Sequence, residues 1–128
     1  MHPNLVSLIA VAAVVQYLVF GALVGRARGL YGVQAPAVTG DERFERQYRV
    51  QMNTLEQLVA FLPALFLAAA HWSATAAVVG GAVYLVGRTL YALAYVREPR
   101  SRGAGFMLTF VPTVVLLIGA AVGLLRGL

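Results

Sequence analysis

Four long apolar runs, separated by polar segments, limit what this chain can fold into. The first run, residues 4–25, carries no charged side chain and matches the roughly 20 residues that a helix needs to cross a bilayer. The other runs cover residues 55–72, 74–96 and 105–125. Because 60% of the residues are hydrophobic and 12% are charged, the chain has more apolar side chains than one soluble core needs. The sequence predicts a single all-α domain, residues 1–128, that spans a membrane with four helices.

The charged segment before the second run is expected to continue its helix. No glycine or proline lies between Glu42 and Leu55, so this helix should begin near Glu42 and extend outside the bilayer. Pro63 should kink it, because proline removes a backbone donor and crowds the preceding turn. Pro112 is a second internal proline, in the fourth run.

All ten basic residues are arginines, and their placement predicts the orientation. Residues 26–49 carry five arginines and residues 97–102 carry three, whereas the N-terminus and the turn at residues 71–74 carry none. Basic residues concentrate on the cytoplasmic side of membrane proteins. Both termini are therefore expected to face away from the cytoplasm, with Arg126 as an exception. Arginines in membrane-flanking turns form no continuous basic face, which argues against a nucleic-acid partner.

The absence of cysteine excludes several kinds of chemistry. Without it the chain has no disulfides, thiolate metal sites or cysteine nucleophiles. The two histidines, His2 and His71, stand near a terminus and in a short turn, so no metal site is expected. Any sulfur chemistry must come from a substrate.

Two polar strips are expected to meet at the cytoplasmic side. At about 100° per residue, one face of the second helix and one face of the third each carry a strip of polar side chains. Interfacial arginines and tyrosines often anchor helices by snorkelling, but polar groups that enter hydrocarbon need partners. The second helix carries Glu45, Arg49, Asn53 and Glu56, and the third carries Tyr84, Arg88, Tyr91 and Tyr95.

These polar faces also predict self-association. Polar side chains that would otherwise face lipid favour contacts between helices, so we expect the bundle to associate with further copies of the chain. Small residues permit close helix approach, and the third helix offers Gly80, Gly81 and Gly87.

The string Glu45-Arg46-x-x-Arg49-x-Gln51-x-Asn53-x-x-Glu56 resembles the helix-two signature of the MAPEG family. These are the membrane-associated proteins in eicosanoid and glutathione metabolism, and they include the microsomal glutathione transferases and leukotriene-C synthase. The resemblance extends over nearly the whole chain. It includes the four spans, the basic first loop, Pro63, the pattern Tyr84-x-x-x-Arg88-x-x-Tyr91-x-x-x-Tyr95 and the trailing Arg102.

The resemblance implies a homotrimer that holds glutathione between neighbouring subunits near the cytoplasmic surface. It implies that the catalytic residue is Arg102, which would face the thiol, with Arg100 as the neighbour that could take its place. The implied glutathione-binding positions are Arg28, Arg49, Gln51, Asn53, Glu56, Tyr91 and Tyr95.

The chemistry of glutathione suits these residue types. Arginine forks can bind its two carboxylates, and Glu56 can bind its ammonium group. A thiol has a pKa of about 8.5, and a nearby cation lowers it and so favours the nucleophilic thiolate. Arg102 would act in this way, since arginine is too basic to serve as a general base.

The expected function is a membrane-bound glutathione transferase for an apolar electrophile, in detoxification. Peroxidase activity remains an alternative, because both reactions begin with the same thiolate. Gln57 and Gly29 replace a tyrosine and an arginine of the family's leukotriene synthase, so a bacterial-type member in an inner membrane fits better. A non-enzymatic lipid-binding scaffold of the same fold is the second hypothesis, and a small four-span transporter is the third.

Overall fold

The computed structural model describes residues 3–128, and over this part of the chain its regular elements are all helices. Four of the helices are long and apolar enough to cross a membrane. This confirms the predicted all-α membrane fold. In chain order the elements are α1 (Pro3–Tyr31), α2 (Glu42–His71), α3 (Ala74–Arg97), the short 3₁₀-helix η1 (Pro99–Arg102) and α4 (Gly103–Arg126).

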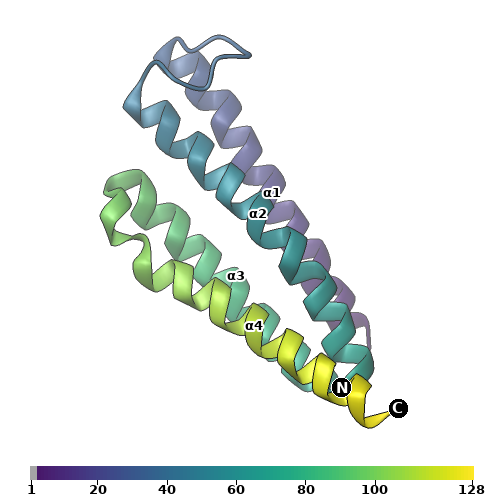
Figure 1. Cartoon of the computed structure of the whole chain (residues 1–128). Helices are drawn as coiled ribbons and strands as arrows, with labels where there is room; N and C mark the ends of the chain where they lie inside the picture. The colour runs from purple at the N-terminus through teal and green to yellow at the C-terminus, as the bar shows by residue number, and fades with distance from the viewer. Residues whose placement is uncertain (1–2) are drawn as a thin grey trace.

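The helices form two antiparallel pairs (Figure 1). α1 packs along α2 and α3 packs along α4, while α2 also contacts both α3 and α4. The two pairs meet at the end that holds both termini, and they diverge toward the end that holds the α1–α2 loop and η1. The arginine-rich segments therefore gather at the diverging end.

The first helix is longer than its apolar run predicts. α1 continues past residue 25 to Tyr31, because Arg26 and Arg28 are good helix formers that can extend beyond the hydrocarbon region. Gly32 ends the helix with φ of 69°, a left-handed conformation that glycine adopts without steric cost. The backbone N–H of Val33 donates to the carbonyl of Arg28 at 3.1 Å and closes this end.

The second helix begins at Glu42, as predicted. Asp41 caps it, since its side chain accepts a hydrogen bond from the backbone N–H of Arg43 at 2.8 Å. The guanidinium of Arg43 also bonds Asp41 and lies 4.1 Å from the centre of the Tyr31 ring, which ties the start of α2 to the end of α1. α2 then continues unbroken past Pro63 to His71.

Glycines in α3 allow close packing inside one chain. A Cβ atom at Gly80 would lie 3.2 Å from Leu116 of α4, and one at Gly87 would lie 2.5 Å from Leu108. A Cβ atom at Gly81 would overlap Ile9 of α1 and would lie 3.3 Å from Leu65 of α2. The predicted close approach at these glycines is confirmed, and the approaching helices belong to the same chain.

Candidate functional site

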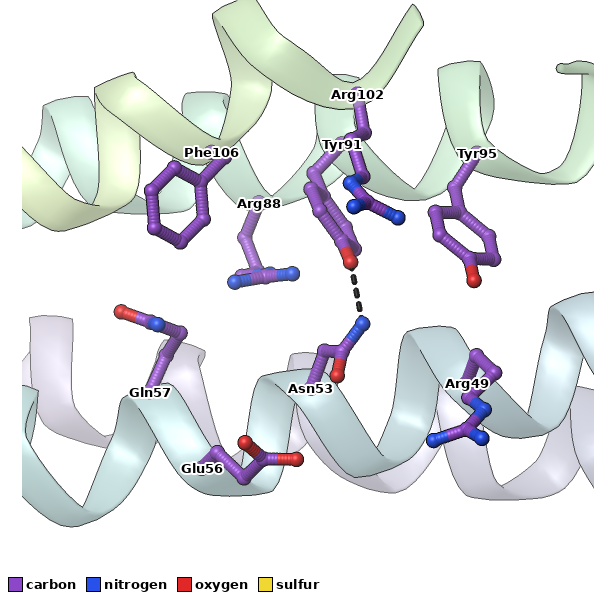
Figure 2. Close-up of a pocket in the computed structure, with 9 residues that line it drawn as sticks. All are labelled: Arg49, Asn53, Glu56, Gln57, Arg88, Tyr91, Tyr95, Arg102 and Phe106. Carbon is purple, nitrogen blue, oxygen red and sulfur yellow. Dashed lines mark hydrogen bonds between the residues drawn. The ribbon is translucent and has the colours of Figure 1, made fainter. Parts of the chain in front are cut away.

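A polar pocket of about 450 Å³ lies between α2, α3 and the beginning of α4, toward the diverging end of the bundle. Figure 2 shows the side chains of α2 facing those of α3 across it. We call the end beside Gln57 and Phe106 the inner end and the end beside Arg49 and Tyr95 the outer end. The lining residues are Arg49, Asn53, Glu56, Gln57, Arg88, Tyr91, Tyr95, Arg102 and Phe106.

The two predicted polar strips thus face each other within one chain. Their contact explains how polar groups such as Asn53 and Tyr91 avoid lipid without a second subunit. Arg49 and Glu56 remain exposed on the surface of the single chain. Among the members of the two strips, these two are the side chains that still lack cover within residues 3–128.

Aromatic rings of α3 form one wall of the pocket. The rings of Tyr91 and Tyr95 stack with their centres 5.6 Å apart, and both side chains are buried. The amide Nδ2 of Asn53 donates a hydrogen bond to the Tyr91 hydroxyl at 2.5 Å. This bond connects α2 to α3 across the middle of the pocket.

The beginning of α4 lies directly against α3 because residue 105 has no side chain. A Cβ atom at Gly105 would lie 2.5 Å from the backbone nitrogen of Tyr91, so the two atoms would overlap. This close contact brings Arg102, at the end of η1, and Phe106, in the first turn of α4, to the pocket.

Arg102 and Arg100 differ in their relation to the pocket. The guanidinium carbon of Arg102 lies 5.8 Å from the centre of the Tyr95 ring, and its side chain extends toward the space between Tyr91 and Tyr95 (Figure 2). Arg100 is not among the lining residues. The Ser101 hydroxyl fixes this turn by donating to the carbonyls of Ala94 at 3.1 Å and Glu98 at 2.7 Å.

Arg46 joins α2 to the end of α3 beside the pocket. Its Nη1 donates to the carbonyls of Val96 at 3.2 Å and Arg97 at 2.9 Å, and its Nη2 pairs with Glu42. The last carbonyls of a helix lack partners within the helix. Arg46 therefore satisfies the end of α3 and holds it near α2, a role that the helix-two string alone does not reveal.

Two of the predicted glutathione-binding residues lie outside this pocket. Arg28 donates to the carbonyl of Ala37 at 2.7 Å, with its guanidinium carbon 4.7 Å from the centre of the Phe44 ring. Gln51 faces α1, where its Nε2 lies 2.8 Å from the position of a Cβ atom at Gly21. The other predicted residues are brought together at the pocket, and these are Arg49, Asn53, Glu56, Tyr91, Tyr95 and Arg102.

Two members of the polar strips also lie elsewhere. Glu45 accepts a hydrogen bond from the backbone N–H of Gly40 at 3.2 Å. Tyr84 is buried, and its ring stacks on Phe61 at a centre-to-centre distance of 3.7 Å. Shared helical spacing therefore places residues on one face without placing all of them in one pocket.

Three lining residues were not predicted as site residues. Arg88 gave the clearest signal, as a charged residue inside the third apolar run. Gln57 lies one residue after Glu56, and it extends the polar strip of α2 toward the inner end. Phe106 gave no signal, because its place at the pocket depends on the packing of α4 against α3.

Metal ligands do not gather in the described part of the chain. Among residues 3–128 no group of three or more His, Cys, Asp or Glu side chains could hold a metal ion. His71 is the last residue of α2, far along the helix from its pocket residues. The other histidine of the sequence analysis, His2, falls outside the described residues.

Comparison with known proteins gives the family. The sequence model of the MAPEG family matches residues 6–122. An uncharacterized protein of Synechocystis sp. is 48% identical over 119 residues, which cover 93% of this chain and 87% of that protein.

Further relatives have names that refer to glutathione or leukotriene chemistry. Microsomal glutathione S-transferase 2 of Homo sapiens is 33% identical over 120 residues, 94% of this chain and 82% of that protein. Leukotriene C4 synthase of Cavia porcellus is 37% identical over 106 residues, 83% of this chain and 71% of that protein. With a family match over nearly its whole length and four membrane-compatible helices, the chain belongs to the MAPEG family.

Proposed function

We propose that this protein is a membrane-bound glutathione transferase that activates the glutathione thiolate for attack on an apolar electrophile. The observation that carries the proposal is the convergence of cationic, acidic, amide and phenol groups on one pocket. A soluble, multiply charged tripeptide needs such groups, and a lipid does not. The name of the relative microsomal glutathione S-transferase 2 supports the same conclusion.

The charges of the pocket suit glutathione in its thiolate form. Three arginines and one acid line it, which gives a net charge of +2 when all four are ionised. Glutathione thiolate carries two carboxylates, one thiolate and one ammonium group, so its net charge is −2. Arginine binds carboxylates through paired hydrogen bonds, and Glu56 offers a carboxylate to the ammonium group.

Arg102 is the residue proposed to stabilise the thiolate. A permanent positive charge beside a thiol lowers its pKa, and each unit of lowering corresponds to about 1.4 kcal/mol. The thiol proton passes to water, since arginine stays protonated. The thiolate sulfur then gives its electron pair to an electrophilic carbon, and the leaving group or ring oxygen of the substrate takes the displaced pair.

We propose that the active form is a homotrimer in which a neighbouring subunit completes the site. Arg49 and Glu56 are exposed on the single chain, and an exposed acid at the start of an apolar segment is costly in a membrane. Arg28 and Gln51 face away from the pocket of their own chain. In a ring of subunits, these two residues are available to the pocket of the next subunit.

The apolar electrophile would approach from the lipid. Phe106 and the aliphatic residues around it on α4 are exposed, so the inner end of the pocket borders a surface that lipid would cover. Both termini are proposed to face away from the cytoplasm, with the arginine-rich end and the pocket on the cytoplasmic side. A bacterial inner membrane is the proposed location, in agreement with the cyanobacterial relative.

A spectroscopic titration with glutathione tests this function. Bound thiolate absorbs near the ultraviolet edge, so one titration of the protein in detergent micelles reports binding and activation together. We expect saturable binding, thiolate formation at neutral pH and conjugation of an apolar electrophile. Binding without thiolate would remove the transferase mechanism, and absence of binding would favour the lipid-binding scaffold.

A further inference from the structure

A second hollow lies at the end of the bundle that holds the termini, opposite the polar pocket (Figure 1). Its volume is about 550 Å³, and it lies between the α2–α3 turn and the second half of α4. We call it the terminal hollow. His71 and Trp72 line it on the side of the turn. The lining residues of α4 share one helical face, and these are Val115, Ile118, Gly119, Val122, Gly123 and Arg126.

The turn lies directly on the backbone of α4 beside this hollow. Residues 119 and 123 have no side chains at the contact, where a Cβ atom at Gly119 would overlap the Trp72 ring and one at Gly123 would overlap the His71 carbonyl oxygen. The two glycines thus allow the turn to form one wall of the terminal hollow, and the side chains of α4 around them form the rest.

Most of the lining surface is apolar and uncovered by the chain itself. The exposed fractions are 47% for Val115, 59% for Ile118, 42% for Val122 and 48% for Trp72. At 1.5 Å per residue, the lining face of α4 is about 16 Å long, which is about half the thickness of a hydrocarbon core. The aliphatic part of the terminal hollow therefore has the length of one leaflet.

Arg126 carries a charge that has no counter-ion within the described residues. The five acids of the sequence lie between residues 41 and 56 and at residue 98, toward the diverging end. The ion pairs among residues 3–128 involve Arg43 and Arg46. Arg126 is also the exception to the arginine placement that predicts the orientation. An anion from outside the chain would supply its missing partner.

The order of groups along the terminal hollow fits an anionic phospholipid. The Arg126 guanidinium can bind a phosphate through paired hydrogen bonds, and a ring N–H of His71 is a second donor. Trp72 has the amphipathic ring that is typical of the membrane–water interface. No acid lines the hollow, so the ammonium group of a zwitterionic lipid would find no partner there.

We infer that the terminal hollow binds an anionic phospholipid of the leaflet on the side of the termini. The phosphate lies at Arg126 and His71, and an acyl chain follows Val122 and Ile118 along α4. This site is separate from the polar pocket, so it does not depend on the proposed function. Because the lipid contacts both the α2–α3 turn and α4, its binding should also stabilise the fold.

Native mass spectrometry of the protein in mild detergent tests the selectivity. The protein is titrated with phosphatidylglycerol and with phosphatidylcholine of the same acyl chains. We expect wild type to bind its first phosphatidylglycerol at least about tenfold more tightly, because only this lipid presents its phosphate without a cation. Phosphatidylglycerol should also raise the temperature of unfolding more than phosphatidylcholine does. Equal affinity for the two lipids would overturn the inference.

Arg126→Gln tests the headgroup contact. This variant should bind the two lipids about equally, with its affinity for phosphatidylcholine unchanged. Arg97→Gln is the matched control, because Arg97 is also an exposed arginine in the last turn of a helix but does not line the terminal hollow. The control should keep the preference of wild type. The inference fails if both variants lose the preference or if both keep it.

Val122→Phe tests the acyl-chain contact by filling the terminal hollow without changing its charge. It should weaken the binding of both lipids, whereas Leu125→Phe should not, since Leu125 is exposed on α4 outside the hollow. Equal lipid affinity of these two variants would place the lipid elsewhere and overturn the inference. A change in subunit number in Arg126→Gln, with the lipid preference retained, would show instead that a second copy covers this face.

Discussion

At the end of the bundle that holds the termini, the turn between α2 and α3 lies directly against α4. There a Cβ atom at Gly119 would overlap the Trp72 ring, and one at Gly123 would overlap the carbonyl oxygen of His71. At the opposite end the helix pairs diverge, and polar side chains line a pocket of about 450 Å³. The comparison teaches that direct backbone contact at one end can hold the helices while polar side chains gather around a pocket at the other end.

Removing charges at the open end should change binding and leave folding intact. We expect Arg49→Ala and Glu56→Ala each to weaken glutathione by about 1.5 to 3 kcal/mol, the usual range for hydrogen bonds to charged groups. Isothermal titration in detergent measures this, with native mass spectrometry to check the oligomer. Glu45→Ala is the matched control, because Glu45 bonds Gly40 outside the pocket. Wild-type affinity in both variants would show that the pocket does not hold glutathione.

Removing Arg102 should affect the reactive state of the thiol more than its binding. In Arg102→Ala the apparent thiol pKa should rise, because the cation stabilises only the charged form. A rise of about two units would reduce activity at neutral pH by about 10- to 100-fold, with partial recovery in alkali. Thiolate absorbance against pH measures the shift. Arg100→Ala is the control, and a shift there instead would move the role to Arg100.

Adding one carbon at the end that holds the termini should change the stability of the fold and not the binding of glutathione. Gly123→Ala forces α4 away from His71 and should destabilise the fold by about 1 to 3 kcal/mol, as overpacking does. Gly25→Ala makes the same change in α1 where nothing lies within 4 Å of the new carbon, so stability there should hold or rise slightly. Thermal unfolding in detergent compares them. Equal stability of the two variants would show that the packed end tolerates separation.

The smallest expected effect concerns the loop before α2. The side chain of Arg43 bonds Asp41 and lowers the pKa of that carboxyl to about 2. Because the pKa in the folded state is lowered, the charged cap stabilises the fold above pH of about 4 and loses this effect as pH falls toward 2. Asp41→Asn keeps an N-cap and removes the titration. Its stability difference from wild type should therefore shrink in acid, and a constant difference would contradict the assignment.

The helix spans and the polar strips could be predicted from the sequence because each depends on local features. Apolar runs, the absence of a helix breaker before Leu55 and helical spacing are all visible without a structure. The packing partners of each helix face could not be predicted in this way. Phe106 reaches the pocket only because Gly105 lies against Tyr91, and Gln51 faces α1 although it belongs to the same string as Asn53. Whether these residues bind glutathione remains a prediction.

The first residues of α1 and the last residues of α4 lie at the same end of the bundle (Figure 1). In the orientation proposed above, with four membrane-compatible helices, both termini face the same side of the membrane, so copies of the gene could be joined in tandem by short linkers without reversing any subunit. A linked form of the proposed homotrimer would let each copy carry a different substitution. Arg49→Ala in one copy and Arg28→Ala in the next would then reveal which copies share a site. If the two substitutions fall in the same site, one site is lost, and if they fall in different sites, two are lost.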